Sequence, residues 1–243
     1  THEHYWPTQR GNVKASELLV GDVVPSVQLP APDGVKSLAF DRDELGWLVG
    51  FYIAEGFITP KGVGFSIHCS EVEEYQRIKN FAESIDGTAQ FRKSTGSGAV
   101  VTVYSQAMRE LLKQYVSGDS CKNKRLTRKA WMHGNDFLDG VLRGYLDGDG
   151  HFDAKANRYR IGFTNNDGLA VDLRALCARL RKVCKLRLAK FTCQTGVFKG
   201  WRGSITEPSS FRTAKPNGQV VAIRASRARE YWDIEVADEP HLF

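Results

Sequence analysis

Two related stretches of nine residues decide how this chain of 243 residues is organised: LVGFYIAEG at Leu48–Gly56 and LRGYLDGDG at Leu142–Gly150. Each stretch is mostly apolar and ends in an acidic residue followed by glycine. The acidic residues are Glu55 and Asp149. A pattern of this length that occurs twice indicates an internal repeat, in which each copy begins with one buried helix.

Small residues recur at every fourth position of the two predicted helices: Gly46, Gly50 and Ala54 on the first, and Gly140, Gly144 and Gly148 on the second. Residues four apart share one face of a helix, so each helix has a stripe that is nearly free of side chains. A glycine inside a helix costs about 1 kcal/mol relative to alanine, and close packing of two backbones would offset that cost. We therefore expect the helices to pair along their stripes. The apolar residues expected to face the core of each half are Leu45, Leu48, Tyr52, Leu138, Leu142 and Tyr145.

Pairing of the stripes would bring Glu55 and Asp149 side by side. Both carboxylates would then meet the negative end of a helix dipole and repel each other. A divalent cation between them resolves both problems, and oxygen ligands in small number favour Mg²⁺, with Mn²⁺ as a substitute.

The other interpretation is two unrelated buried helices, each ending at a capping glycine. The small and acidic residues occupy matching positions in the two copies, and this match favours the paired helices.

The elements expected after each stretch follow the same order. Residues 41–117 are expected to form helix, two strands, helix, two strands and helix, and residues 135–224 repeat this order. The fold class is therefore α+β with two αββαββα repeats. The expected parts are an N-terminal segment and linker (1–38), repeat 1 (39–118), a linker (119–134), repeat 2 (135–224) and a C-terminal segment (225–243).

The formal net charge of +6 suits a polyanionic partner such as nucleic acid. A two-stranded ribbon fits the major groove of a duplex, and its polar and basic side chains can read base edges there. The alternative is an ordinary solvated sheet face. The candidate DNA contacts on the predicted strands and turns are Lys61, Ser66, His68, Arg92, Lys93, Arg158, Arg160, Lys190, Lys199 and Arg202. A further basic run is expected on a helix as a solvated face: Arg174, Arg179, Arg181, Lys182 and Lys185.

The five cysteines show no paired short spacing, so we expect reduced thiols and no zinc site. No stretch is long and apolar enough to predict a membrane span. These features are typical of a cytoplasmic protein.

The two ends of the chain carry sequence patterns that differ from those of the middle. Thr1 and His4, followed by Gly21-Asp22, resemble a conserved block of inteins, and Asp233 and His241 resemble a second block near the intein C-terminus. The resemblance implies short all-β segments of a splicing domain, encoded in a prokaryote or phage and embedded in host protein segments. The chain begins with no Cys or Ser and lacks a terminal His-Asn pair, so we do not expect it to splice by itself.

The doubled stretch and the repeated order of elements, over roughly 41–224, resemble the double-motif LAGLIDADG homing endonucleases. The resemblance implies saddle-shaped antiparallel sheets and a monomeric, site-specific enzyme. Such an enzyme cuts both strands of a long DNA target by metal-dependent phosphodiester hydrolysis and leaves short 3′ overhangs. It assigns metal binding and catalysis to Glu55 and Asp149. The segment 121–127, CKNKRLT, resembles the block that carries the family's active-site lysine, which would be Lys124; in the second half our choice is Lys215.

Three functions remain open from the sequence. The first is the Mg²⁺-dependent DNA endonuclease, which requires both acidic residues. The second is an intein fragment that acts in protein splicing, which rests on the residues at the chain ends. The third is a DNA-binding protein that has kept the fold and lost cleavage.

Overall fold

The structure is a computed structural model that describes residues 4–25, 41–94, 96–193, 196–207, 217–219 and 223. The chain divides into two compact units: residues 29–207 form one, and residues 1–28 together with 208–243 form the other. The helices are η1 (Ala15–Glu17), α1 (Arg42–Glu55), α2 (Val72–Glu83), α3 (Gln106–Tyr115), α4 (Arg128–Trp131), α5 (Asn135–Asp149) and α6 (Asp167–Arg179). None of the helices in the described part of the chain is long and apolar enough to cross a membrane.

The strands of the larger unit are β4 (Gly56–Thr59), β5 (Gly62–His68), β6 (Thr88–Lys93), β7 (Gly98–Tyr104), β8 (Val116–Ser117), β9 (Arg125–Leu126), β10 (Gly150–Asp153), β11 (Arg158–Thr164), β12 (Val183–Cys193) and β13 (Gly196–Thr206). The smaller unit contains β1 (Tyr5–Thr8), β2 (Gly11–Lys14), β3 (Val23–Pro25) and β14 (Asn217–Gln219). All pairings are antiparallel.

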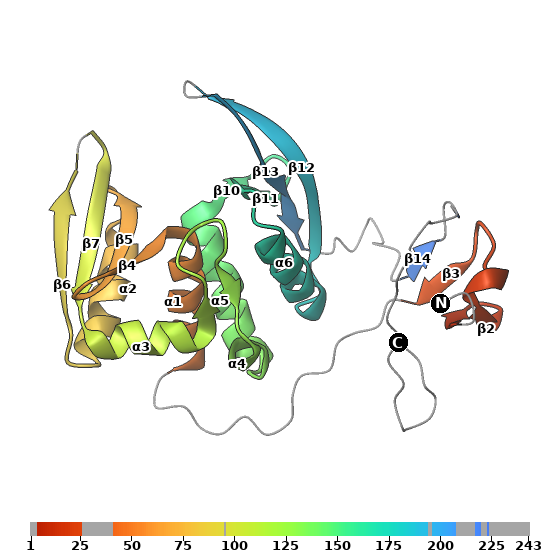
Figure 1. The fold of residues 1–243 in the computed structure, drawn as a ribbon, viewed down its shortest axis with the longest axis horizontal. Coiled ribbons are helices and arrows are strands. Elements are labelled where there is room, and N and C mark those ends of the chain that lie inside the picture. Colours follow the sequence, from red (N-terminus) through yellow and green to blue (C-terminus); the bar gives the residue numbers. More distant parts are fainter. Residues whose placement is uncertain are drawn as a thin grey trace. The chain divides into compact units, whose positions relative to one another are not determined.

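Helices α1 and α5 pack against each other at the centre of the larger unit (Figure 1). Their contact runs along the predicted stripes. A Cβ atom added to Gly50 would lie 1.9 Å from the carbonyl oxygen of Val141, and one added to Gly144 would lie 2.0 Å from that of Trp47. No side chain fits such a gap, so glycine is what lets the two backbones touch. The expected pairing of the two helices is confirmed.

The two repeats form two four-stranded sheets with the same strand order. The first sheet runs β4–β5–β7–β6 and the second runs β10–β11–β13–β12. Helices α2 and α3 pack on the first sheet, and α5 and α6 pack on the second. The core includes the residues expected to face it, because Leu45, Leu48, Tyr52, Leu138, Leu142 and Tyr145 are all at most 2% exposed. The mixed helix and sheet architecture predicted from the sequence is therefore confirmed.

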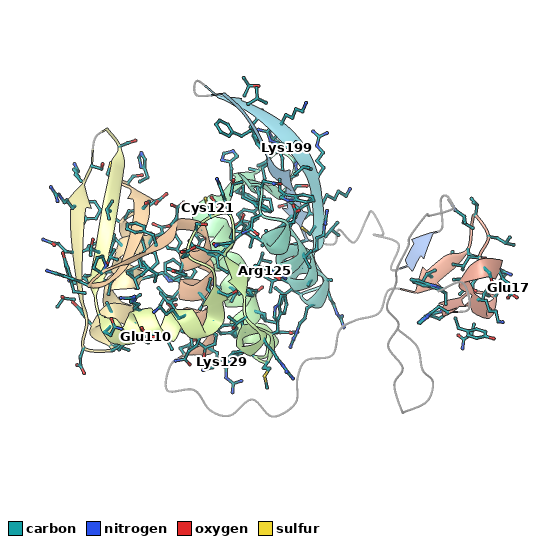
Figure 2. The ribbon with its side chains drawn as sticks, in the orientation of Figure 1. Glu17, Glu110, Cys121, Arg125, Lys129 and Lys199 are labelled. Carbon is teal, nitrogen blue, oxygen red and sulfur yellow. The ribbon has the colours of Figure 1, made fainter. Side chains whose placement is uncertain are left out.

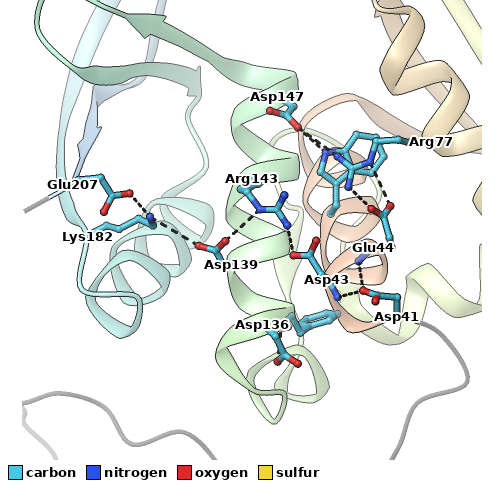
Figure 3. A network of polar contacts seen from close by, with 12 residues as sticks. Asp41, Asp43, Glu44, Arg77, Asp136, Asp139, Arg143, Asp147, Lys182 and Glu207 are labelled. Atoms are coloured by element: carbon cyan, nitrogen blue, oxygen red, sulfur yellow. Dashed lines mark hydrogen bonds and ion pairs between the residues drawn. The ribbon is translucent and has the colours of Figure 1, made fainter.

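A polar network joins the two repeats beside the helix pair (Figure 3). The indole nitrogen of Trp47 donates to a carboxylate oxygen of Asp147 over 2.7 Å. The guanidinium of Arg77 lies 3.9 Å from the centre of the Trp47 ring and pairs with Glu44. These contacts join α1, α2 and α5, so they fix the first sheet's helix layer to the second repeat.

The described strands of the second repeat stop well before the expected boundary at residue 224. Its last described strand, β13, ends at Thr206, and no counterpart of α3 follows among the described residues. Residues Asn217–Gln219 pair instead with Val23–Pro25 in the smaller unit. Three-residue strands carry too little sequence pattern to reveal such a long-range pairing. The expected boundary at residue 224 stays a prediction.

The smaller unit is held by hydrogen bonds around one buried acid. Asp22 is 3% exposed, accepts from the Arg10 guanidinium at 2.6 and 2.8 Å, and accepts from the Leu19 amide at 2.8 Å. The Arg10 side chain lowers the pKa of Asp22 to about 2. Gly21 and Asp22 lie between β2 and β3, and Gly21 has a φ of +103°, which favours glycine at this turn.

Candidate metal and nucleic-acid site

The structure brings Glu55 and Asp149 together at the ends of α1 and α5. Each is the last residue of its helix, and the following glycine donates its amide to the helix: Gly56 to Tyr52 and Gly150 to Leu146. The helix ends touch, because a Cβ atom on Gly148 would lie 2.6 Å from the Ala54 Cβ and 3.1 Å from the Glu55 Cγ. One carboxylate from each repeat therefore reaches the same place.

Both carboxylates are half-buried, and this raises their pKa values. Burial raises the pKa of Glu55 to about 7, and the charge of Asp149 adds to the shift. Burial also raises the pKa of Asp149 to about 6, although the charge of Lys124 opposes this. Acids with strongly shifted pKa values that lie near each other are typical of functional sites. A bound cation would favour the ionised form of both.

The donors present here fit a hard divalent cation held by few protein ligands. No group of three or more His, Cys, Asp or Glu side chains that could hold a metal occurs among the described residues, so Glu55 and Asp149 stand as a pair. Mg²⁺ is commonly bound by one or two carboxylates, with water and substrate phosphates in the remaining positions. Asp147, the other acid of the second stretch, already accepts the Trp47 indole N–H and lies in the polar network.

Lys124 lies beneath the end of α1 rather than on an open surface. It is 3% exposed, and its Nζ donates to the carbonyl oxygens of Tyr52 at 2.8 Å, Ile53 at 3.2 Å and Gly56 at 2.5 Å. These carbonyls carry the negative end of the helix dipole, so the amine stabilises the helix end. Burial lowers the pKa of Lys124 to about 8, while the charges of Asp149 and Glu55 oppose that shift.

The linker that contains Lys124 is fixed by residues of the second repeat. Asn166 donates its side-chain amide to the carbonyls of Lys124 and Cys121, at 2.9 and 3.2 Å. Arg125 pairs with the buried Asp172 at 2.8 Å, and the Leu126 amide donates to the same carboxylate. Sequence reasoning missed Asn166 and Asp172. Asn166 caps the start of α6, a role that local sequence can indicate, but that role does not reveal its contact with the linker.

The open face of the first sheet, turned away from α2 and α3, has a mostly neutral character. Ser66 and His68 are exposed on β5 and alternate with buried Phe65 and Ile67. Of the basic candidates on this sheet, Arg92 lies on the open face, because it is opposite Val100, which in turn pairs with Ser66. Lys93 is exposed at the end of β6, next to Arg92, and therefore belongs to the other face of the sheet. Lys61 lies in the turn between β4 and β5.

The second sheet lines a cavity of about 1120 Å³ that reaches Asp149. The basic side chains that line it come from the open face of the sheet and from α6: His151, Arg158, Arg160, Arg174, Lys185, Arg187 and Arg202. The predicted contacts Arg158, Arg160 and Arg202 are thus brought to one surface with the candidate metal ligand. Arg202 also lies 4.8 Å from the centre of the Phe191 ring.

Lys185, Arg187 and His151 were missing from the residues predicted to contact DNA. The run that contains Lys185 was expected on a helix, but α6 ends at Arg179 and Lys185 lies on β12. Arg181 has a φ of +58°, a left-handed conformation that turns the chain between the two elements. The alternation of exposed Lys185 and Arg187 with half-buried Leu186 was the available signal of a strand.

Two predicted contacts lie farther along the β12–β13 hairpin. Lys190 and Lys199 are exposed and stand opposite each other across the two strands. Figure 2 labels Lys199 on this hairpin. Both lysines lie on the other face of the hairpin from Arg187 and Arg202, which are also paired across the two strands.

Several of the sequence-predicted residues fall outside the described residues: Thr1, Lys215, Asp233 and His241. Of the candidate splicing positions, only His4 is described, and its carbonyl accepts the Ala15 amide at 2.6 Å. The second active-site lysine and the splicing positions therefore stay predictions.

Comparison with known proteins identifies part of the chain by sequence. Residues 136–198 match the family model described as a LAGLIDADG-like domain. The DNA-directed RNA polymerase subunit Rpo1C of Methanocaldococcus jannaschii is 26% identical over 204 residues, which are 65% of this chain and 22% of that protein. The probable translation initiation factor IF-2 of Thermococcus kodakarensis is 26% identical over 149 residues, 60% of this chain and 13% of that protein. The chain therefore spans less than a quarter of the length of these curated relatives.

Comparison of structures identifies the fold. I-DmoI in complex with DNA and calcium has a TM-score of 0.50 and 13% identity, over 69% of this chain and 85% of that one. A variant of I-DmoI with nicked target DNA and manganese has the same score and identity, over 69% and 90%. Residues 136–198 thus match a LAGLIDADG-like family model, and the chain shares the fold of the homing endonuclease I-DmoI.

Proposed function

We propose that this protein is a homing endonuclease that cuts both strands of a long, specific DNA site and leaves short 3′ overhangs. The observation that carries the proposal is the juxtaposition of Glu55 and Asp149 at the end of the basic cavity of the second sheet. The fold shared with I-DmoI, which has been crystallised with DNA and divalent cations, supports the same function. The proposal includes a monomeric enzyme that works in the cytoplasm and uses Mg²⁺, with Mn²⁺ as a substitute.

Each residue of the site has a part in this activity. Glu55 and Asp149 hold the cation, one carboxylate from each repeat. When bound, a divalent cation activates water and offsets negative charge on the phosphate oxygens. Lys124 acts as a positioning residue, because it fixes the end of α1 and its positive charge favours the ionised form of both acids. The arginines and lysines of the two sheets bind the phosphates of the duplex.

Cleavage of the native insertion site is the direct test. The substrate is the native locus with this protein's coding segment removed and the flanking sequences joined, presented on a plasmid. We expect the wild type with Mg²⁺ to linearise this plasmid, and sequencing of the ends to show short 3′ overhangs at one position. The variants Asp149→Asn and Glu55→Gln should bind the plasmid and leave it intact, and Asp147→Asn should still cut.

Two results would contradict the proposal. One is the absence of any cut by the wild type with either Mg²⁺ or Mn²⁺. The other is equal cutting by Asp149→Asn. Tight binding of the joined site without cutting would favour the alternative of a DNA-binding protein that has lost cleavage.

A second candidate function, an intein that carries the endonuclease, is favoured by a specific observation. Strand β14 near the C-terminus pairs with β3 near the N-terminus, so the two ends of the chain belong to one unit and the endonuclease repeats lie between them in sequence. The matched regions also form small parts of two relatives with unrelated names, an RNA polymerase subunit and a translation initiation factor. An inserted module explains both facts.

Complementation tests the intein proposal. The protein is mixed with peptides that carry the N-terminal and C-terminal residues of an intein splicing domain, each joined to a different tag. We expect ligation of the two tags, detected by mass spectrometry, and its loss in the Thr1→Ala and His241→Ala variants. Failure to obtain any ligated product would count against the splicing function and leave the endonuclease proposal unaffected.

A further inference from the structure

The open faces of the two sheets differ strongly in charge. On the first sheet the neutral residues with hydrogen-bonding groups include Ser66, Thr88, Gln90, Thr102 and Tyr104, and the permanent cation is Arg92. Two of the neutral residues are tied to each other, because the Tyr104 hydroxyl donates to the Gln90 side chain over 3.0 Å. On the second sheet, five cations share the open face: Arg158, Arg160, Lys185, Arg187 and Arg202.

One acid partly neutralises the second face. Asp153 accepts from the Arg160 guanidinium at 2.5 and 3.0 Å and lies 3.8 Å from Arg158. Within the described part of the chain, no carboxylate lies within ion-pair distance of Lys185, Arg187 or Arg202. Lys185 and Arg187 are exposed on β12, two residues apart on the same face, and Arg202 stands directly opposite Arg187. Three cations are therefore available together for phosphates.

We infer that the two repeats hold a duplex unequally: the second sheet provides most of the charge-driven, sequence-independent affinity, and the first sheet adds little of it. This inference rests on the proposed function and deepens it. The physical basis is counterion release, which depends on the number of phosphates that basic side chains neutralise. The neutral hydroxyl and amide groups of the first sheet suit contacts with base edges, which carry sequence information but little salt dependence.

Salt titration of binding tests the inference without knowledge of the target site. The full chain is titrated against a fluorescent 30-bp duplex of arbitrary sequence, in EDTA to prevent cleavage, at a series of KCl concentrations. Each phosphate contact contributes about −0.9 to the slope of the logarithm of the binding constant against the logarithm of the salt concentration. The triple variant Lys185→Gln, Arg187→Gln and Arg202→Gln should make the slope shallower by about 2.7.

The matched control removes three cations from the first half: Lys61→Gln, Arg92→Gln and Lys93→Gln. We expect its slope to change by no more than about 0.9, because only Arg92 lies on the open face. A charge-preserving variant, Arg187→Lys with Arg202→Lys, should keep the wild-type slope. Asp153→Asn should have the opposite effect, a steeper slope and tighter binding at low salt, because it releases Arg158 and Arg160 from their shared acid.

The possible results separate the inference from the function on which it rests. Equal changes of slope in the two triple variants, with wild-type binding intact, would overturn the inference and leave the endonuclease proposal standing. A wild type that binds no duplex even at low salt would overturn both. Thermal unfolding of every variant checks whether the exposed substitutions leave the fold intact.

Discussion

Lys124 donates from a buried amine to three backbone carbonyls at the end of α1, and this arrangement sets the cost of removing it. Replacement by methionine keeps the length of the side chain and loses all three hydrogen bonds, which leaves buried carbonyls without donors. We expect Lys124→Met to lower the free energy of unfolding by about 2–3 kcal/mol, measured by urea denaturation. The matched control is Lys122→Met, two residues away and exposed, which should stay within about 0.5 kcal/mol of wild type.

A second substitution at Lys124 tests how closely its site is fitted to an amine. Lys124→Arg should also be less stable than wild type, because its larger guanidinium has to be accommodated where the buried amine donates to three carbonyls. A Lys124→Met protein as stable as wild type would contradict the contacts described above.

His133 is expected to lower the free energy of unfolding as the pH falls. It is 4% exposed, its ring stacks on Phe137 at 4.4 Å, and its Nδ1 has no hydrogen-bond partner among the described residues. Burial lowers its pKa; Arg42 and Lys129 add to the shift, and Asp136 opposes it. The folded state therefore favours the neutral ring. This contribution is complete above the unfolded pKa of about 6.5 and is lost as the pH falls below it.

The measurement is a comparison of wild type with His133→Phe, which keeps an aromatic ring against Phe137. We expect the difference in unfolding free energy between the two proteins to grow in favour of the variant as the pH falls from 7 to 5. The difference isolates His133, because Glu55 and Asp149 titrate in both proteins. A difference that stays constant over this range would show that His133 is not the acid-sensitive group.

At the scale of elements, the glycines of the helix pair allow a sharp test. Gly144→Ala should raise the helix propensity of α5 by about 1 kcal/mol, yet its methyl group would lie 2.0 Å from the Trp47 carbonyl oxygen. The backbones must then separate, so we expect a net loss of about 1–3 kcal/mol in unfolding free energy. Gly162→Ala is the control, because its nearest neighbour would be 3.7 Å away. Equal stability of the two variants would contradict the close contact.

The elements that could be predicted from the sequence are those in which residue types recur at a regular spacing. Several elements carry a regular period: the small residues of α1 and α5 repeat every four positions, and buried and exposed residues alternate in β5 from Phe65 to His68. These patterns led to the helix pair, to the repeated sheets and to the meeting of Glu55 with Asp149. The end of α6 was misplaced because a run of basic residues continues across Arg181 without a proline or glycine.

Contacts between distant segments left no such pattern. Lys124 was recognised as a candidate through a family resemblance, but its burial depends on how the linker runs beneath α1, which local sequence does not encode. Asn166 and Asp172 fix that linker through single hydrogen-bonded side chains. An isolated polar residue of this kind looks the same in sequence whether it is buried or exposed.

At the scale of the whole molecule, the interdependence of the two repeats can be tested by fragments. The segment 29–207 contains both sheets and both central helices and has its own core. We expect it to unfold in one cooperative transition at nearly the temperature of the corresponding transition in the full chain, measured by circular dichroism and calorimetry. Residues 29–118 alone should fail to form a stable monomer, because removal of α5 would expose the backbone stripe and the rings of Trp47 and Phe51. A stably folded, monomeric 29–118 fragment would show that the contact between α1 and α5 is dispensable, and the meeting of Glu55 and Asp149 would then lack the packing energy that holds it.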